Sequence, residues 1–154
     1  MGINLLIESL EKLLKLHKSL LELALKKTGV LEAEDIQALT QLLKEEQAHI
    51  LAIEKIEAER SKAVAAFSST KRTLGELLDE LPPEKQEIVI RISEELRNVI
   101  ARIQKQNELN QGLISQSLKF ISFSRSLVEP PQDDYNYGPN ETGIPGKSLF
   151  SSKA

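Results

Sequence analysis

Two histidines, His17 and His49, are the residues of this 154-residue chain best suited to acid–base or metal chemistry. The chain has no cysteine, so disulfides and thiolate zinc sites are excluded, and a catalytic nucleophile would have to be Ser or Thr. Glu46 precedes His49 at the spacing of a helical metal-binding pair, but Leu14 takes that place before His17. Each histidine lies at or beside an apolar helical stripe. We expect boundary histidines with one ring nitrogen in water, and no metal, cofactor or catalytic residue.

Other groupings of polar residues are explained better by solvent exposure. The adjacent acids Glu45–Glu46 and Glu94–Glu95 lie on the polar faces of predicted helices, where solvation accounts for them better than an acid–base dyad does. The glycines near the C-terminus precede no predicted helix and form no phosphate loop. The sequence therefore predicts that the protein is not an enzyme. A bundle enzyme with an unrecognised metal site is a minor alternative.

Composition and charge exclude several classes of partner. The net charge is −3, and Lys and Arg are interspersed with Glu instead of clustering, so no nucleic-acid partner is expected. Glu8, Glu11 and Lys12 interrupt the apolar N-terminal stretch, which argues against a signal peptide. No apolar run approaches the roughly 18 residues of a membrane span. We expect a cytoplasmic protein that does not insert into membranes.

Heptad spacing of apolar residues predicts a first long helix over residues 3–27. Seven-spaced columns stand side by side along it and form a stripe broad enough to be buried from two sides. These columns are Leu6, Leu13 and Leu20; Ile7, Leu14 and Leu21; and Ile3, Leu10, His17 and Ala24. Thr28 and Gly29 are expected to end the helix, because Gly readily adopts the left-handed conformation that follows many helices.

Two further long helices are predicted. The second begins within residues 32–35, where acids suit a helix N-terminus, and continues to about residue 69. A cluster of leucines suggests a short connecting helix around residues 73–81. The third helix runs from Pro83, a residue suited to the first helical turn, to Val128.

The predicted fold class is therefore all-α: an antiparallel bundle of three long helices plus a short connecting helix, with a disordered C-terminal tail. Residues 1–128 form the bundle. Residues 129–154 are rich in Pro and Gly, and they bury too little apolar surface to offset the entropy of ordering them.

The apolar stripe of the third predicted helix changes direction near residues 107–110. Upstream of Gln106 two seven-spaced columns are mainly aliphatic, and downstream one of them turns into Asn and Ser while a neighbouring column turns apolar. A stripe that changes direction faces a different neighbour. Asn, Gly and Ser also lower the helix propensity of the segment. Residues from about 105 to 128 are therefore predicted to receive a partner helix.

The order of these segments resembles the flagellar export chaperones of the FlgN family. The resemblance rests on LTQLLKEEQAHILAIEKIEAER in the second predicted helix, TLGELLDELPPEK after it and NELNQGLISQSLKFI in the third, followed by a tyrosine-bearing Gly/Pro tail. Its most specific part is Asn107-x-x-Asn110-x-x-Leu113-Ile114, followed by Ser117-Leu118-x-Phe120-Ile121. Arg60, which ends the motif in the second predicted helix, and Leu77-Leu78 before the prolines also fit.

The resemblance implies a chaperone of flagellar type III export. Such proteins bind the terminal helices of hook-associated proteins, keep them soluble and deliver them to the export gate. The implied cargo-binding residues lie near the end of the third helix: Asn107, Asn110, Leu113, Ile114, Leu118, Phe120, Ile121, Phe123 and Leu127. A tail tyrosine, Tyr135 or Tyr137, is implied to contact the export gate. No cofactor is implied, and a monomer or weak homodimer is expected.

Two alternatives remain open from the sequence. Asn and Ser in a helical seam can set the register of the bundle, and Phe120 and Phe123 can fill its end as ordinary core. The second alternative is a structural or signalling coiled-coil protein that self-associates through the first and third predicted helices.

Overall fold

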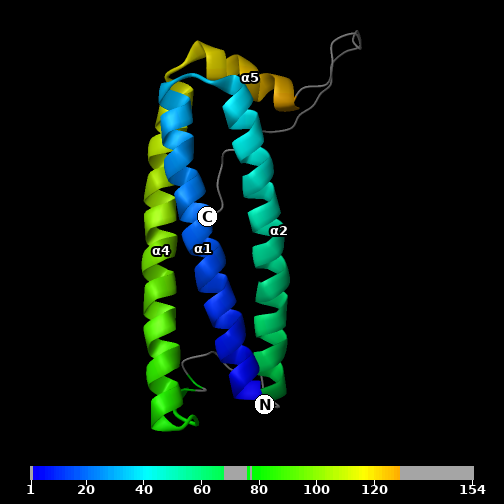
Figure 1. Ribbon diagram of the computed structural model, residues 1–154, viewed down its shortest axis with the longest axis vertical. Helices are drawn as coiled ribbons and strands as arrows, with labels where there is room; N and C mark the ends of the chain where they lie inside the picture. Colours follow the sequence, from blue (N-terminus) through cyan, green and yellow to red (C-terminus); the bar gives the residue numbers. More distant parts are fainter. Residues whose placement is uncertain (1, 68–75, 77, 129–154) are drawn as a thin grey trace.

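The computed structural model describes residues 2–67, 76 and 78–128, and its regular elements within them are all helices (Figure 1). Three helices are long, namely α1 (Gly2–Glu32), α2 (Ile36–Phe67) and α4 (Pro83–Ser115), and α5 (Leu118–Val128) is short. Consecutive long helices run in opposite directions, so α1 and α4 are parallel. The predicted all-α bundle of three long helices is confirmed.

The central helix is α1. It packs against α2 on one side and α4 on the other, whereas α2 and α4 scarcely touch each other. The broad apolar stripe explains this arrangement, because a helix with side-by-side apolar columns can bury surface against two neighbours at once. The expectation that the first helix is covered from two sides is confirmed.

The core consists of three apolar clusters along the bundle, each containing residues of α1, α2 and α4. The lower cluster is Leu6, Leu10, Ala63, Leu81, Val89 and Ile92, and the middle one is Leu20, Leu21, Leu23, Leu42, Val99 and Ile103. The upper cluster, at the α1–α2 turn, is Leu31, Leu39, Ile114 and Phe120, so it also includes a residue of α5. Between residues 43 and 62, α2 contributes no fully buried side chain.

The prediction that the first helix ends at Thr28 and Gly29 is wrong. Gly29 lies inside α1, which continues to Glu32. Leu31, beyond the glycine, is buried in the upper cluster, and burying a leucine outweighs the cost of about 1 kcal/mol for a helical glycine. The chain turns instead at Glu34, whose φ is 54°. Asp35 then caps α2, since its Oδ1 accepts a hydrogen bond of 3.0 Å from the Ala38 N–H.

The prediction of one continuous third helix to Val128 is also wrong. The helix begins at Pro83 as expected, but α4 ends at Ser115 and α5 begins at Leu118. Gln116 is the C-cap of α4, and Ser117 caps α5, a role in which serine is far better than in a helix interior. In Figure 1, α5 turns away from the direction of α4 and crosses the upper end of the bundle.

Two predictions fall largely outside the described residues: the short connecting helix around residues 73–81 and the disordered tail 129–154. At the end of the first of these segments, Leu81 is buried in the lower cluster and Leu78 packs against it. The N–H of Leu81 donates to the carbonyl oxygen of Leu78 at 3.0 Å.

Candidate partner-binding site

The start of α5 is held against the α1–α2 turn by polar contacts with Glu34. The Ser117 hydroxyl donates to the Glu34 carboxylate at 3.1 Å, and the Lys119 ammonium donates to the Glu34 carbonyl oxygen at 3.0 Å. The Ser117 side-chain oxygen also accepts from the Phe120 N–H at 3.4 Å, which is the geometry of a helix cap. The direction of α5 is therefore determined by contacts with residues outside this helix, Glu34 and Ser117.

Phe120 anchors α5 in the bundle. Its side chain is 1% exposed and lies in the upper cluster with Leu31, Leu39 and Ile114. Phe123 is half-buried and packs against the same cluster. Burial of this one phenylalanine contributes much of the free energy that holds α5 against the bundle, because α5 has only 11 residues and contacts the bundle over a short length.

The other side of α5 leaves apolar side chains in solvent. Leu118 is 82% exposed, Ile121 36% and Val128 47%. Spacings of three and seven residues put these side chains on one helical face, about 80–160° from the direction of Phe120. Leu127 is 43% exposed, but it shares the direction of Phe120 and is exposed because it lies at the far end of the helix. We call Leu118, Ile121 and Val128 the exposed face of α5.

The structure thus divides the predicted cargo-binding residues into three groups. Asn110, Ile114 and Phe120 are buried and make contacts within the chain, and Asn107, Leu113 and Phe123 are half-buried. Leu118, Ile121 and Leu127 are exposed. The predicted gate-contacting tyrosines, Tyr135 and Tyr137, lie outside the described residues.

The predicted cargo-binding residues leave out Val128, which is apolar and exposed. Sequence reasoning also missed Glu34 and Lys119, whose contacts orient α5. A signal for the helix break was present, because Ser117 precedes an apolar run in the position favoured for a helix cap. No comparable signal marks Glu34, because its role depends on α5 returning to a turn more than eighty residues earlier in the sequence.

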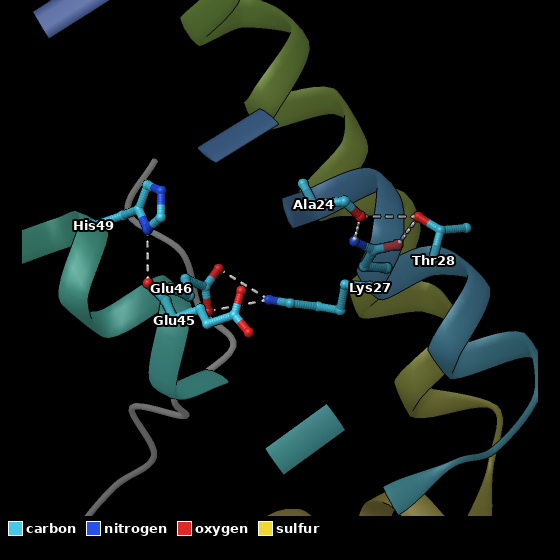
Figure 2. A network of polar contacts seen from close by, with 7 residues as sticks. Ala24, Lys27, Thr28, Glu45, Glu46 and His49 are labelled. Carbon is cyan, nitrogen blue, oxygen red and sulfur yellow. Dashed lines mark hydrogen bonds and ion pairs between the residues drawn. The ribbon is translucent and has the colours of Figure 1, made fainter. Parts of the chain in front are cut away.

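Directly below the upper cluster, a buried polar network joins α1 to α4 (Figure 2). The Asn110 side-chain amide donates to the carbonyl oxygen of Ala24 at 3.0 Å, and the Thr28 hydroxyl lies 2.5 Å from the Asn110 Oδ1. Gln106 donates to the Thr28 hydroxyl at 2.6 Å. A buried amide with partners for both its ends specifies one register of two helices. Asn110 therefore belongs to the bundle seam.

A second cross-link at the same level joins α1 to α2. Figure 2 shows the Lys27 side chain extending to Glu46, whose two carboxylate oxygens lie 3.1 and 3.0 Å from the ammonium. Lys27 is 5% exposed, so this pair is shielded from water, unlike most lysine ion pairs. The two cross-links fix α2 and α4 on α1 immediately below the site.

The histidines take structural roles. The His49 Nδ1 lies 2.8 Å from the Glu45 carbonyl oxygen and therefore carries a proton, and its Nε2 lies 2.8 Å from the Ser19 hydroxyl (the Glu45 contact is drawn in Figure 2). The expectation of a ring nitrogen in water is thus wrong for His49, which links α2 to α1. The His17 Nδ1 lies 2.8 Å from the Leu13 carbonyl oxygen. Within the described ranges, no group of three metal-ligating side chains is present.

Among the residues that the structure describes, Arg60 is the titratable group whose pKa departs from its ordinary value. Arg60 on α2 donates from Nε to both carboxylate oxygens of Glu57 at 2.8 Å, and this hydrogen bonding raises the pKa of the Arg60 guanidinium. The pair joins residues of one helix on the bundle surface, and it stabilises the charge that arginine already carries. It adds no acid or base for catalysis.

The fold and this site define the class of the molecule: a helical bundle that presents an apolar helical face at one end. The family model for FlgN protein matches residues 1–142, and the chain belongs to the FlgN family. The uncharacterized protein YvyG of Bacillus subtilis (strain 168) is 33% identical over 160 residues, covering the whole of both chains. No solved structure matches the chain.

Membership in the FlgN family confirms the resemblance described above. The family is one of flagellar chaperones and not of enzymes, so flagellar proteins are the partners that membership implies. Among the described helices, none is long and apolar enough to cross a membrane.

Proposed function

We propose that this protein is a cytoplasmic chaperone of flagellar type III export, which binds terminal helices of hook-associated proteins and delivers them to the export gate. The observation that carries the proposal is the exposed face of α5. Leu118, Ile121 and Val128 form an apolar stripe at helical spacing, which is the surface that an amphipathic partner helix needs.

The way in which α5 is held supports reversible binding. One buried anchor, Phe120, and a few polar contacts to Glu34 fix a short helix at the end of the bundle. Such an element has a lower local stability than the long helices, so it can adjust to a partner without unfolding the bundle. A chaperone that must release its cargo needs this moderate affinity.

The binding of a synthetic peptide from the terminal helix of a hook-associated protein tests the proposal. The double variant Leu118→Gln/Ile121→Gln should raise the Kd by about tenfold or more, since two apolar side chains lose their burial. Both side chains are solvent-exposed, so the bundle should keep its stability. Truncation after Lys105 would be a poorer test, because it removes Asn110, Ile114 and Phe120 from the core.

The matched control is Leu5→Gln/Ile90→Gln. Leu5 and Ile90 are exposed apolar residues at the opposite end of the bundle, and the double variant makes the same chemical change. Calorimetric titration should show unchanged peptide binding for this control. Equal Kd values for the two double variants would exclude α5 as the cargo site.

Delivery to the export gate is a separate part of the proposal and is assigned to Tyr135 or Tyr137. Single Tyr→Ala variants should weaken capture of the full chain by the gate component and leave peptide binding unchanged. Sedimentation of the unmodified chain distinguishes the alternative, since a self-associating coiled-coil protein would form a stable oligomer that the peptide does not alter.

A further inference from the structure

A groove between α1 and α2, in the part of the bundle nearer to the N-terminus, plays no part in the proposed cargo site. It measures about 590 Å³ and has an apolar floor of Leu16, Ala52 and Ile56. Here α2 passes through the stretch that contributes no fully buried side chain, so its apolar residues are covered only in part.

The rim of the groove is positively charged, although the protein as a whole is acidic. Lys12, Lys15 and Lys55 line it together with a single acid, Glu59. Lys12 has a distant contact of 3.9 Å with Glu8, and among the described residues no carboxylate pairs with Lys15 or Lys55. An apolar floor inside a lysine rim fits a segment that carries acids beside aromatic side chains.

We propose that this groove binds the acidic tyrosine-containing segment 129–141 of the same chain. The segment, EPPQDDYNYGPNE, has four acids and no base, and both tyrosines of the protein lie in it. Asp133 and Asp134 stand directly before Tyr135, so the carboxylates can face the lysines while a tyrosine ring covers the floor. The groove and the segment are therefore complementary in charge, and both offer apolar surface.

The dimensions of the chain allow this binding. The segment follows α5, whose Phe123 packs against the cluster that contains Leu39 of α2. From Leu39 to the stretch between Ala52 and Ile56 the distance along α2 is about 20–26 Å, at a rise of 1.5 Å per residue. An extended chain covers this distance in roughly six to eight residues, so the residues around Tyr135 can come level with the groove floor.

Tyrosine fluorescence tests the inference on the full chain. The protein has no Trp, and its two tyrosines both lie in the segment, so the emission reports on this segment alone. Bound tyrosines should be quenched by acrylamide less than those of a free peptide of residues 129–141. The double variant Lys15→Glu/Lys55→Glu should lower the binding equilibrium constant roughly tenfold and raise quenching toward the value of the free peptide.

The matched control is Lys44→Glu/Lys105→Glu, which makes the same charge change at exposed lysines outside the groove and should leave quenching unchanged. Asp133→Lys/Asp134→Lys combined with the groove variant should restore protection. If the groove variant folds poorly, salt provides a second measurement, because added NaCl should release the tyrosines of the unmodified chain.

Three results would overturn the inference. The first is quenching of the unmodified chain equal to that of the free peptide, and the second is an equal response of the groove and control variants. The third is protection that disappears on dilution, which would assign the segment to the groove of a second copy. None of these results bears on cargo binding at α5, so the two proposals can fail separately.

Discussion

The side-chain amide of Asn110 on α4 donates a hydrogen bond to the main-chain carbonyl oxygen of Ala24 on α1, and the two atoms lie 3.0 Å apart in the buried interior. The oxygen of the same side chain accepts a hydrogen bond from the Thr28 hydroxyl. Asn110 is only 2% exposed, and both its nitrogen and its oxygen have hydrogen-bond partners. This contact fixes the register of two parallel helices. Their apolar stripes alone would allow one helix to shift along the other.

Removal of this amide should destabilise the bundle. Asn110→Ala removes the contacts with Ala24 and Thr28 and leaves a gap in a buried polar network. We expect the free energy of unfolding to fall by about 1–3 kcal/mol. Urea denaturation measures this change. The matched control is Asn98→Ala on the exposed side of α4, which should change stability by less than about 0.5 kcal/mol. Equal effects would show that the network adds nothing.

Removal of the Phe120 side chain should lower the local stability of α5 more than the global stability of the bundle. Full deletion of a buried phenylalanine side chain costs about 3–5 kcal/mol, but α5 can detach locally at a lower cost. Phe120→Ala should therefore remove amide-exchange protection from residues 120–128 and lower global stability by less than that amount. Leu118→Ala, in the same helix but 82% exposed, should preserve the protection. A loss of protection across α1 as well would contradict the prediction.

The shielded pair Lys27–Glu46 should respond differently to single and double substitution. Glu46→Gln removes the negative charge that faces a lysine with 5% exposure, and this should cost about 3 kcal/mol in urea unfolding. The double variant Lys27→Met/Glu46→Leu leaves no buried charge at this place and should be close to neutral. Glu54→Gln, at an exposed position of α2, serves as the control. The prediction fails if the double variant is the less stable of the two.

The turn residue Glu34 should show two opposing effects. Its φ of 54° costs an ordinary residue about 1 kcal/mol, which glycine avoids, so Glu34→Gly should stabilise the α1–α2 turn. The same change removes the carboxylate that accepts from Ser117, and amide exchange in α5 should become faster. Glu34→Gln keeps a side-chain oxygen that can accept from Ser117, but it leaves the backbone strain at φ 54° in place. Glycine should therefore give the higher global stability and glutamine the better-protected α5.

Local sequence determined most of the bundle. The seven-spaced columns of residues 3–27 predicted a helix covered from two sides, and α1 packs between α2 and α4. Pro83 marked the start of α4 correctly. These features were accessible because helical periodicity and the conformational limits of proline are properties of neighbouring residues.

Tertiary contacts decided the two helix ends that the sequence predicted incorrectly. Gly29 stays helical because Leu31 beyond it is buried by residues of α2, α4 and α5. The third helix breaks at Gln116 and Ser117 because the following helix gains a buried position for Phe120 at the end of the bundle. In both cases the stabilising partner lies far away in the sequence, so local propensity could not reveal it.

The same reason limits what the sequence determined about the candidate site. It identified residues 105–128 as unusual, since apolar residues there alternate with Asn, Gly and Ser. It did not determine that Phe120 would be 1% exposed and Leu118, two residues earlier, 82% exposed. That division follows from the orientation of α5, which Glu34 and the upper cluster impose across the end of the bundle. Helical spacing defines which side chains share a face, and only packing against distant segments selects the face that is buried.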